Sequence, residues 1–354
     1  PGAATTTSIL QQQQQQQQQH HPRRTTALFA VSALVKKAKE AELRKYIADG
    51  IEDNVMEQYK IIQAALEQDE DSNTSSSDSS APPMGSLQET LTRRKGTITV
   101  IAEYKRKLSG GSSIIDKDIF APELLSSEFR EFGAHGIAVL ADERMGGCTY
   151  DDLSLFVEDQ RRSKNSVPGP VHVINSDIIV DELQIARSAA AGASAVVLNL
   201  ELLGSDMTKK LLRASQAVNL EVIVAVSTKE EAQQAIDLGA RMVSVVNLPD
   251  AEGKVEAVTD LKIPDGATVT TIANILHRGD KGLAEVEEAW ACRDKGFNCA
   301  WISDALYKSG NNANEHPGAI IKSMSAKSSV RWASPVAKSG RGEGAREYLG
   351  DIMM

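Results

Sequence analysis

Two kinds of apolar pattern alternate along most of this chain. Short runs rich in Val, Ile and Ala are typical of buried strands, and the stretches between them place their apolar residues on one helical face. The strands are predicted to begin near Ile98, Ile137, Val171, Ala195, Glu221, Met242, Thr268 and Cys299. The helices are predicted over Leu87–Thr92, Leu124–Phe132, Tyr150–Arg162, Glu182–Ala191, Asp206–Val218, Lys229–Leu238, Asp250–Ile263 and Leu283–Arg293.

Eight strand–helix units over about 230 residues match the size of a TIM barrel. The sequence therefore predicts an α/β protein with a (β/α)8 TIM barrel. Gly192, Gly239 and Gly296 follow predicted helices and are expected to end them, and Gly50 is expected to end an earlier helix. A doubly wound open sheet is the alternative, but no predicted strand is followed by a glycine-rich nucleotide-binding motif.

Composition divides the chain into five segments. The barrel is preceded by an acid-free stretch, an amphipathic helical stretch and an acidic, serine-rich stretch, and it is followed by a polar one. The predicted segments are a disordered leader (1–30), a helical N-terminal extension (31–68), a disordered linker (69–86), the barrel (87–326) and a C-terminal tail (327–354).

The leader has the composition of a targeting segment. Residues 1–30 contain no Asp or Glu, and they combine the run Gln11–Gln19 with Thr, His and Arg residues. Such a basic, hydroxylated segment is typical of a transit peptide. The motif Ala27–Ala30 resembles the cleavage neighbourhood of plastid presequences in algae with secondary plastids. We predict an organellar location, in the plastid stroma; a low-complexity tail without an address, on a cytoplasmic protein, is the alternative.

Global composition excludes several classes of function. The net charge is −9 and the pI is near 5.3, so nothing in the charge balance indicates a nucleic-acid or membrane-surface protein. No apolar run approaches the roughly 18 residues of a membrane span. The cysteines Cys148, Cys292 and Cys299 have no metal-ligand spacing, so we predict neither a metal site nor disulfides. No cofactor is predicted.

The candidate chemistry centres on the end of the first strand. Glu103 and Lys105 are two positions apart, and such residues of a strand project to the same face. Active sites of TIM barrels lie at the C-terminal ends of the strands, so both side chains are expected at the mouth as candidate catalytic groups. Ser109 and Gly110 follow in a glycine-rich loop and are candidate substrate-binding residues. The alternative is a plain ion pair at a strand end.

Other polar residues follow the later strands. Each of them alone is explained by a cap or a loop, and Asp177 in particular could brace a turn. Together they predict a mouth rich in carboxylates and amides. The remaining candidate substrate-binding residues are Asp142, Ser176, Asp177, Asn247, Asn274 and Ser303.

Several of these segments resemble one enzyme family. The AEYK motif at 102–105 is similar to the Ala-Glu-Val-Lys motif of indole-3-glycerol-phosphate synthase. The segments at 138–143 (AVLADE), 176–200 and 230–247 also resemble that family, in the right order and at barrel spacing. The resemblance covers roughly residues 87–324, and the helices before the barrel fit it too.

The resemblance implies a role in tryptophan biosynthesis. The family is a carboxy-lyase that closes the indole ring of an anilino-deoxyribulose phosphate, with loss of water and carbon dioxide. It would use Glu103 to position the substrate or exchange protons with it. Lys105 would neutralise charge on the carboxylate and phosphate side of this small substrate.

Several positions depart from the family pattern. The general-acid lysine of the third strand is replaced by Ser176, and a serine hydroxyl has no proton to give near neutral pH. The other departures are Ala225 for a glutamate, Val246 for an asparagine (with Asn247 adjacent), Thr271–Asn274 for Ser-Glu-Ser-Gly, Ser303–Ala305 for Gly-Glu/Thr-Ser, and Leu108–Gly110 for Ser-Pro-Ser.

Three functions remain open from the sequence. The first is a degenerate member of the family, a pseudoenzyme that keeps the barrel for binding or scaffolding. The second is an active synthase in which Arg106 or Lys107 replaces the missing cation. The third is a barrel that acts on another phosphorylated ligand through Glu103, Asp142 and Asp177. The N-terminal extension or the tail is a candidate contact for a protein partner.

Overall fold

The computed structural model describes residues 33–71, 85–92, 97–109, 121–278, 283–308 and 317–325. The chain divides into two units, residues 1–51 and 52–354. The first contains a helix over residues 33–49, which ends at Gly50, a residue with φ of +106°. The predicted leader, the tail and Gly110 lie outside the described residues. Within the described part of the chain, no helix is long and apolar enough to cross a membrane.

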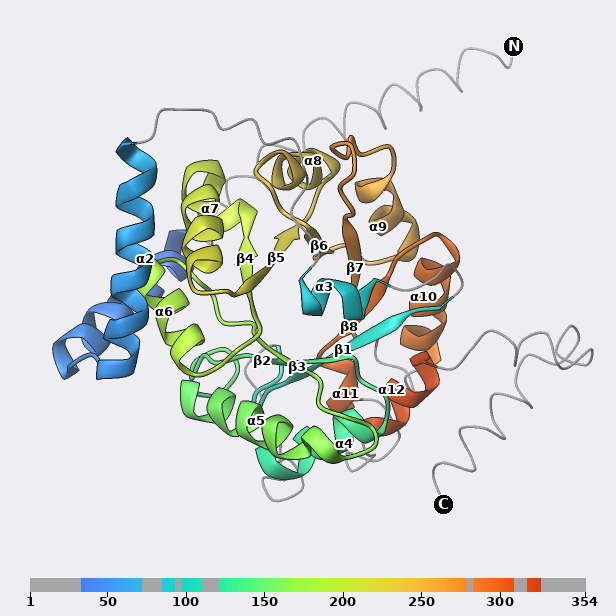
Figure 1. Cartoon of the computed structure of the whole chain (residues 1–354). Helices are drawn as coiled ribbons and strands as arrows, with labels where there is room; N and C mark the ends of the chain where they lie inside the picture. Colours follow the sequence, from blue (N-terminus) through green and yellow to red (C-terminus); the bar gives the residue numbers. More distant parts are fainter. Residues whose placement is uncertain are drawn as a thin grey trace, which may run out of the picture. The chain divides into compact units, whose positions relative to one another are not determined.

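The second unit is built around a closed barrel of parallel strands in the order β1 to β8 (Figure 1). This confirms the predicted (β/α)8 fold. The closing pair is β1 with β8, in which Thr99 lies opposite Cys299 and Ala102 opposite Ile302. The strands are β1 (Thr99–Tyr104), β2 (Gly136–Val139), β3 (His172–Asn175), β4 (Ala195–Asn199), β5 (Glu221–Val226), β6 (Met242–Val245), β7 (Thr270–Ile275) and β8 (Cys299–Ile302).

Helices surround the strands as an outer ring (Figure 1). Gly192, Gly239 and Gly296 all have positive φ and follow helices, as predicted. The helices are α2 (Asp53–Asp71), α3 (Ser86–Leu91), α4 (Pro122–Glu131), α5 (Tyr150–Arg162), α6 (Glu182–Ala190), α7 (Leu200–Ala217), α8 (Lys229–Asp237), α9 (Ala251–Val258), α10 (Leu283–Asp294), α11 (Ala305–Lys308) and α12 (Gly318–Ser325), with a short 3-10 turn at Ser163–Asn165.

Three helices differ from the prediction by more than two residues. Helix α9 ends at Val258, five residues before the predicted end at Ile263. Helix α7 begins at Leu200, six residues before the predicted start at Asp206, because it continues across a kink at Gly204, whose φ is +72°. Helix α2 extends to Asp71, into the segment predicted as a linker. No glycine or proline stands between Gln68 and Asp71 to end it.

The barrel interior is filled by small and branched apolar side chains. Alternate residues of each strand point inward, and one large aromatic, Trp301, takes part. This agrees with an aromatic content of only 4%. The buried cluster contains Leu87, Leu91, Ile101, Ala138, Ile174, Ala195, Ile223, Met242, Ile272, Cys299 and Trp301, with Val197 packed against it.

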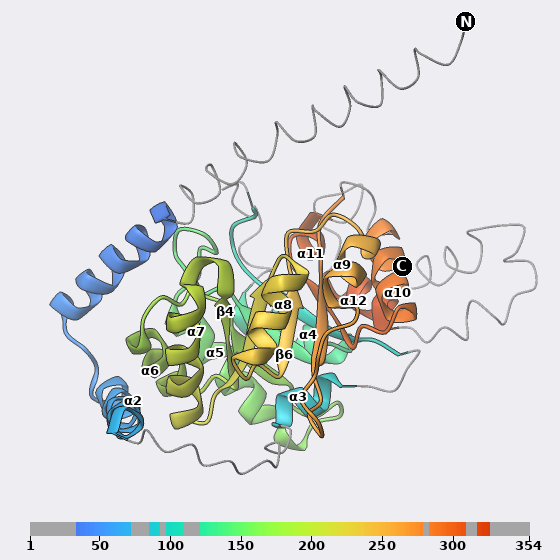
Figure 2. The ribbon, with the colours of Figure 1, turned by 90° about the horizontal axis from the view of Figure 1, so that it is seen from above.

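Helix α3 closes the N-terminal end of the barrel (Figure 2). Its residues Leu87 and Leu91 belong to the interior cluster and are fully buried. The Glu221 carboxylate, at the start of β5, accepts the backbone N–H groups of Leu87 at 2.7 Å and of Gln88 at 2.9 Å. These N–H groups have no partner inside a helix, so the carboxylate caps α3 and fixes it to the sheet.

Replacing Glu221 with alanine is expected to destabilise the fold. The change leaves the two α3 N–H groups without their acceptor, which should lower the free energy of unfolding by about 1–2 kcal/mol. Urea unfolding monitored by circular dichroism measures this. Glu256→Ala is the matched control, because Glu256 is exposed on α9 and should change stability by less than about 0.5 kcal/mol. Equal effects of the two substitutions would contradict the capping role.

The three cysteine thiols should be unreactive in the folded protein. Burial raises the pKa of Cys148, Cys292 and Cys299 from 9.0 to about 12. At pH 8 a thiol-specific reagent is expected to label them only after unfolding in urea, because the folded protein provides neither the thiolate form nor access for the reagent.

The raised thiol pKa values also make stability depend on pH. Between pH 9 and 12 the thiols of the unfolded chain lose their protons before those of the folded protein. Stability should therefore fall as pH rises, by at most about 1.4 kcal/mol per pH unit and thiol. Rapid labelling of folded protein would contradict the burial.

Candidate functional site

The candidate site lies where the strands end at the C-terminal side of the barrel. Residues two or four positions beyond an interior residue share its inward direction. This register brings Glu103 of β1 into line with Ile101, and Ser176 with Ile174. By the same rule, the other positions of this ring are Leu140, Asn199, Ala225, Val246, Asn274 and Ser303.

The Glu103 carboxylate is held by two serine hydroxyls. Ser176, directly after β3, donates to Oε1 at 2.8 Å, and Ser303, directly after β8, donates to Oε2. The carboxylate residue is 9% exposed. A buried carboxylate needs such donors, because burial without hydrogen bonds is costly. The predicted site residues Glu103, Ser176 and Ser303 thus form one cluster.

Tyr307 supports the same strand end from α11. Its phenol donates to the Glu103 carbonyl oxygen at 2.9 Å and accepts from the Lys105 N–H at 3.3 Å. Burial raises the pKa of this phenol well above its usual value, so it stays protonated and able to donate. Tyr307 therefore fixes the backbone that carries both candidate catalytic side chains.

Lys105 is paired with an aspartate that follows the last strand, β8. Its ammonium group forms an ion pair with the Asp304 carboxylate, and the two side chains are 4% and 11% exposed. Ser109 contacts the same carboxylate, through its N–H at 3.1 Å from Oδ2 and through its hydroxyl at 3.1 Å from Oδ1. The predicted residues Lys105 and Ser109 therefore meet at Asp304.

The two predicted aspartates are engaged by nearby groups of the chain. Asp142 accepts the N–H groups of Arg144 and Met145, both at 2.7 Å, and so holds the turn after β2. Asp177 is 2% exposed and accepts from the Tyr150 phenol at 3.2 Å and the Gln184 amide at 3.1 Å. Since these partners belong to α5 and α6, Asp177 faces the helix layer, which agrees with its role as a brace.

The two predicted asparagines lie at the ends of β6 and β7. Asn247 is exposed, has φ of +62°, and donates to the Ser227 hydroxyl at 3.4 Å. Asn274 is half-buried on β7, opposite Trp301 of β8. The register gives Asn274, not Asn247, the inward direction, and the role of either residue in binding stays a prediction.

The two cations after Lys105 are turned to other partners. The Arg106 guanidinium donates to the Tyr104 phenol at 3.0 Å and to Asp152 of α5 at 2.6 Å. The Lys107 ammonium donates to the Glu143 carbonyl oxygen. Neither cation contacts the Glu103 carboxylate, although both are close to it in sequence.

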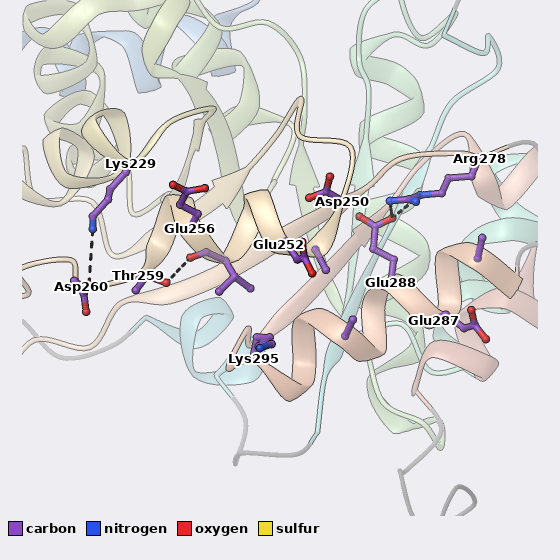
Figure 3. Close-up of a pocket in the computed structure, with 14 residues that line it drawn as sticks. Lys229, Asp250, Glu252, Glu256, Thr259, Asp260, Arg278, Glu287, Glu288 and Lys295 are labelled. Atoms are coloured by element: carbon purple, nitrogen blue, oxygen red, sulfur yellow. Dashed lines mark hydrogen bonds and ion pairs between the residues drawn. The ribbon is translucent and has the colours of Figure 1, made fainter. Parts of the chain in front are cut away.

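A groove of about 950 Å³ lies on the outside of the barrel, between α9 and α10 (Figure 3). Six of its lining residues are acids and three are bases. At one side Glu288 is paired with Arg278 and with the fully buried Lys254. Glu103 and Lys105 are not among the lining residues, which are Lys229, Asp250, Ala251, Glu252, Val255, Glu256, Thr259, Asp260, Arg278, Ala284, Glu287, Glu288, Ala291 and Lys295.

The groove offers surface carboxylates, whereas the mouth offers a carboxylate and an ammonium group within one hydrogen-bonded assembly. Within the described ranges, no three His, Cys, Asp or Glu side chains are grouped to hold a metal ion. The fold is that of a (β/α)8 barrel, and the strand-end pair lies at the C-terminal face, where such barrels carry their active sites.

Comparison with known proteins specifies the class. The sequence pattern of the family "Indole-3-glycerol phosphate synthase" matches residues 51–316. The indole-3-glycerol phosphate synthase of Opitutus terrae is 25% identical over 71% of this chain and 88% of its own length. The enzyme of Chlorobium luteolum is 29% identical over 65% and 82%. The chain belongs to the indole-3-glycerol phosphate synthase family.

Other similarities cover less of the chain or have a lower sequence identity. The indole-3-glycerol phosphate synthase of Leptospira interrogans is 31% identical over 45% of this chain, and the match spans 58% of that protein, less than two thirds of its length. Among solved structures, a thiamine phosphate pyrophosphorylase from Pyrococcus furiosus has a TM-score of 0.45 and 13% identity, over 76% of this chain and 100% of that chain.

Sequence reasoning missed two contributors to the site. Tyr307 was not predicted, because a tyrosine in a short helix gives no pattern of its own. Asp304 lies within the segment Ser303–Ala305, which departs from the family pattern, but it was not predicted as a site residue. Its contact with Lys105 joins the first and last strands, and only the closed barrel brings these together.

Tyr307→Phe is expected to loosen the end of β1. The change removes one hydroxyl and leaves the Glu103 carbonyl and the Lys105 N–H without it, so unfolding free energy should fall by about 1–3 kcal/mol. The midpoint of urea unfolding measures the loss. Tyr59→Phe is the matched control, because the side chain of Tyr59 is partly exposed on α2. A Tyr307→Phe protein as stable as the control would contradict the support described above.

Proposed function

We propose that this chain is a member of the indole-3-glycerol phosphate synthase family that lacks the ring-closing activity and keeps its barrel for binding or scaffolding. One observation carries the proposal. Both charged groups of the first-strand motif are engaged by partners from the chain itself, Glu103 by two hydroxyls and Lys105 by a carboxylate. Neither charged group can bind a substrate in place of these partners until the contacts are broken.

The missing general acid supports the same proposal. Ring closure requires a proton donor beside the substrate carbonyl, and the family resemblance places that lysine at Ser176. The Ser176 hydroxyl already donates a hydrogen bond to the Glu103 carboxylate, at 2.8 Å. A hydroxyl does not ionise near neutral pH, and loss of one positioned acid typically costs a factor of about 10²–10⁴ in rate.

The opposite side of the mouth lacks a second group. The position that the resemblance gives to a glutamate is Ala225, an inward residue of β5 that is 6% exposed. A methyl group can neither exchange a proton nor stabilise a positive charge. The effects of two such losses on the rate are not additive, but each loss removes a source of transition-state stabilisation.

An active synthase with rearranged groups is the second candidate. Its support is that Glu103 and Lys105 remain together at the barrel mouth. Arg106 and Lys107 would have to supply the missing cation. Against this, the Arg106 guanidinium is paired with Asp152 and the Lys107 ammonium is bound to a carbonyl oxygen. Both would have to leave these partners.

A turnover assay tests the proposal. The full chain is incubated with the anilino-deoxyribulose phosphate substrate of the family, and formation of the indole ring is followed by fluorescence. A synthase of the family, assayed at the same concentration, is the positive control. We expect a rate below about 10⁻² of that control, because the general acid is absent.

Product formation near the control rate would contradict the proposal, provided that it belongs to this chain. The variants Glu103→Gln and Lys105→Met show whether the activity belongs to this chain, because the activity of a contaminating enzyme would survive both substitutions. Loss of activity in both variants would establish the rearranged synthase instead.

A further inference from the structure

Three hydrogen-bond donors converge on the Asp304 carboxylate at the barrel mouth. The Ser109 N–H lies 3.2 Å from Oδ1 and 3.1 Å from Oδ2, and the Ser109 hydroxyl lies 3.1 Å from Oδ1. The Lys105 ammonium completes the set as an ion pair. We infer that Asp304 is an internal anion that fills an oxyanion-binding position and thereby excludes phosphorylated ligands from the mouth.

The place of Asp304 in the barrel supports the inference. In TIM barrels a phosphate is frequently bound by the loops after the last two strands. Asp304 comes two residues after β8 ends at Ile302. Since β8 is paired with β1, the loop after β1 brings Ser109 and Lys105 to the same spot. All three donors therefore come from the end of β1 and the loop after it, and the carboxylate that they bind follows the adjacent strand β8.

The chemistry of the donors is that of an anion site. A backbone N–H, a hydroxyl and an ammonium group are groups that hold phosphate or carboxylate oxygens, and the charged one strengthens the set. The Lys105 side chain is only 4% exposed, so its charge requires an anion close by. Here a side chain of the protein provides that anion.

Attachment to the chain gives Asp304 the advantage over a free ligand. A group tethered beside its site competes at an effective concentration that a dissolved anion does not reach easily. A phosphate would also face two carboxylates, Asp304 and Glu103, because both contact residues of this cluster. The inference rests on the proposed function in that it concerns the same mouth, and it identifies the ligand class that this mouth rejects.

A purely structural ion pair would have a different consequence. If Asp304 only stabilises the loop after β8, its removal should destabilise the protein without creating affinity for any anion. If it fills an anion site, its removal should let a dissolved oxyanion take over the same donors. Anion binding by the variant therefore separates the two roles.

The experiment compares Asp304→Ala with the unchanged full chain. Inorganic phosphate and sulfate are titrated calorimetrically at constant ionic strength, with chloride as the non-specific anion, and the melting temperature is recorded with each anion. We expect Asp304→Ala to bind phosphate at least about tenfold more tightly than the unchanged chain, since hydrogen bonds to a charged group contribute this much. The melting temperature of the variant should rise with phosphate.

Two further variants keep the test decisive. Asp304→Asn retains the shape and one oxygen acceptor while it removes the charge, so it provides a folded comparison if the alanine variant is unstable. It should show the same direction of change, to a smaller extent. The double variant Asp304→Ala with Lys105→Met should lose the gained phosphate binding, because the ammonium group is absent.

The outcomes of the titrations are distinct from those of the turnover assay. Phosphate binding by the unchanged chain would overturn the inference, and so would folded Asp304 variants that bind no oxyanion. Neither result depends on whether the indole ring is formed. Turnover by the unchanged chain would end the proposal of an inactive barrel and would also overturn the inference, because the substrate is itself phosphorylated. Without turnover, the titrations alone decide the inference.

Discussion

The pairing of β1 with β8 is the constraint on which the mouth depends. It closes the barrel and brings together residues that are far apart in the chain: Ser303 is 200 positions from the Glu103 that it contacts. The same closure places Asp304 against Lys105. Without this pairing the carboxylate and the ammonium would each have to remain in water, because burial of a single charge is too costly.

The contacts at the mouth follow from that cost. A carboxylate at Glu103 that is largely removed from water needs donors, and the serines at 176 and 303 provide them. A buried ammonium at Lys105 needs an anion, and Asp304 provides it. Ser176, Ser303 and Asp304 therefore satisfy, from within the chain, the two charged groups that follow one another at the end of β1.

The apolar pattern predicted the barrel well, because strand cores and helix ends depend on local sequence. The strand at Glu221 begins where it was predicted, whereas the helix predicted to begin at Asp206 begins at Leu200 and contains a kink at Gly204. The site was less predictable. The direction of Asp177 depends on the strand register, which turns it toward α5 and α6. The partnership of Asp304 with Lys105 depends on barrel closure, and no local pattern encodes it.

Stability and mouth chemistry occupy opposite ends of this barrel. At the N-terminal end Glu221 caps α3, and Leu87 and Leu91 of that helix complete the interior cluster. At the C-terminal end the strand-end residues can change without disturbing that cluster, provided that each buried charge keeps a partner. Such a division lets the residues of the mouth vary while the fold of the family is kept. What constrains the mouth is then charge balance, which Asp304 supplies for Lys105.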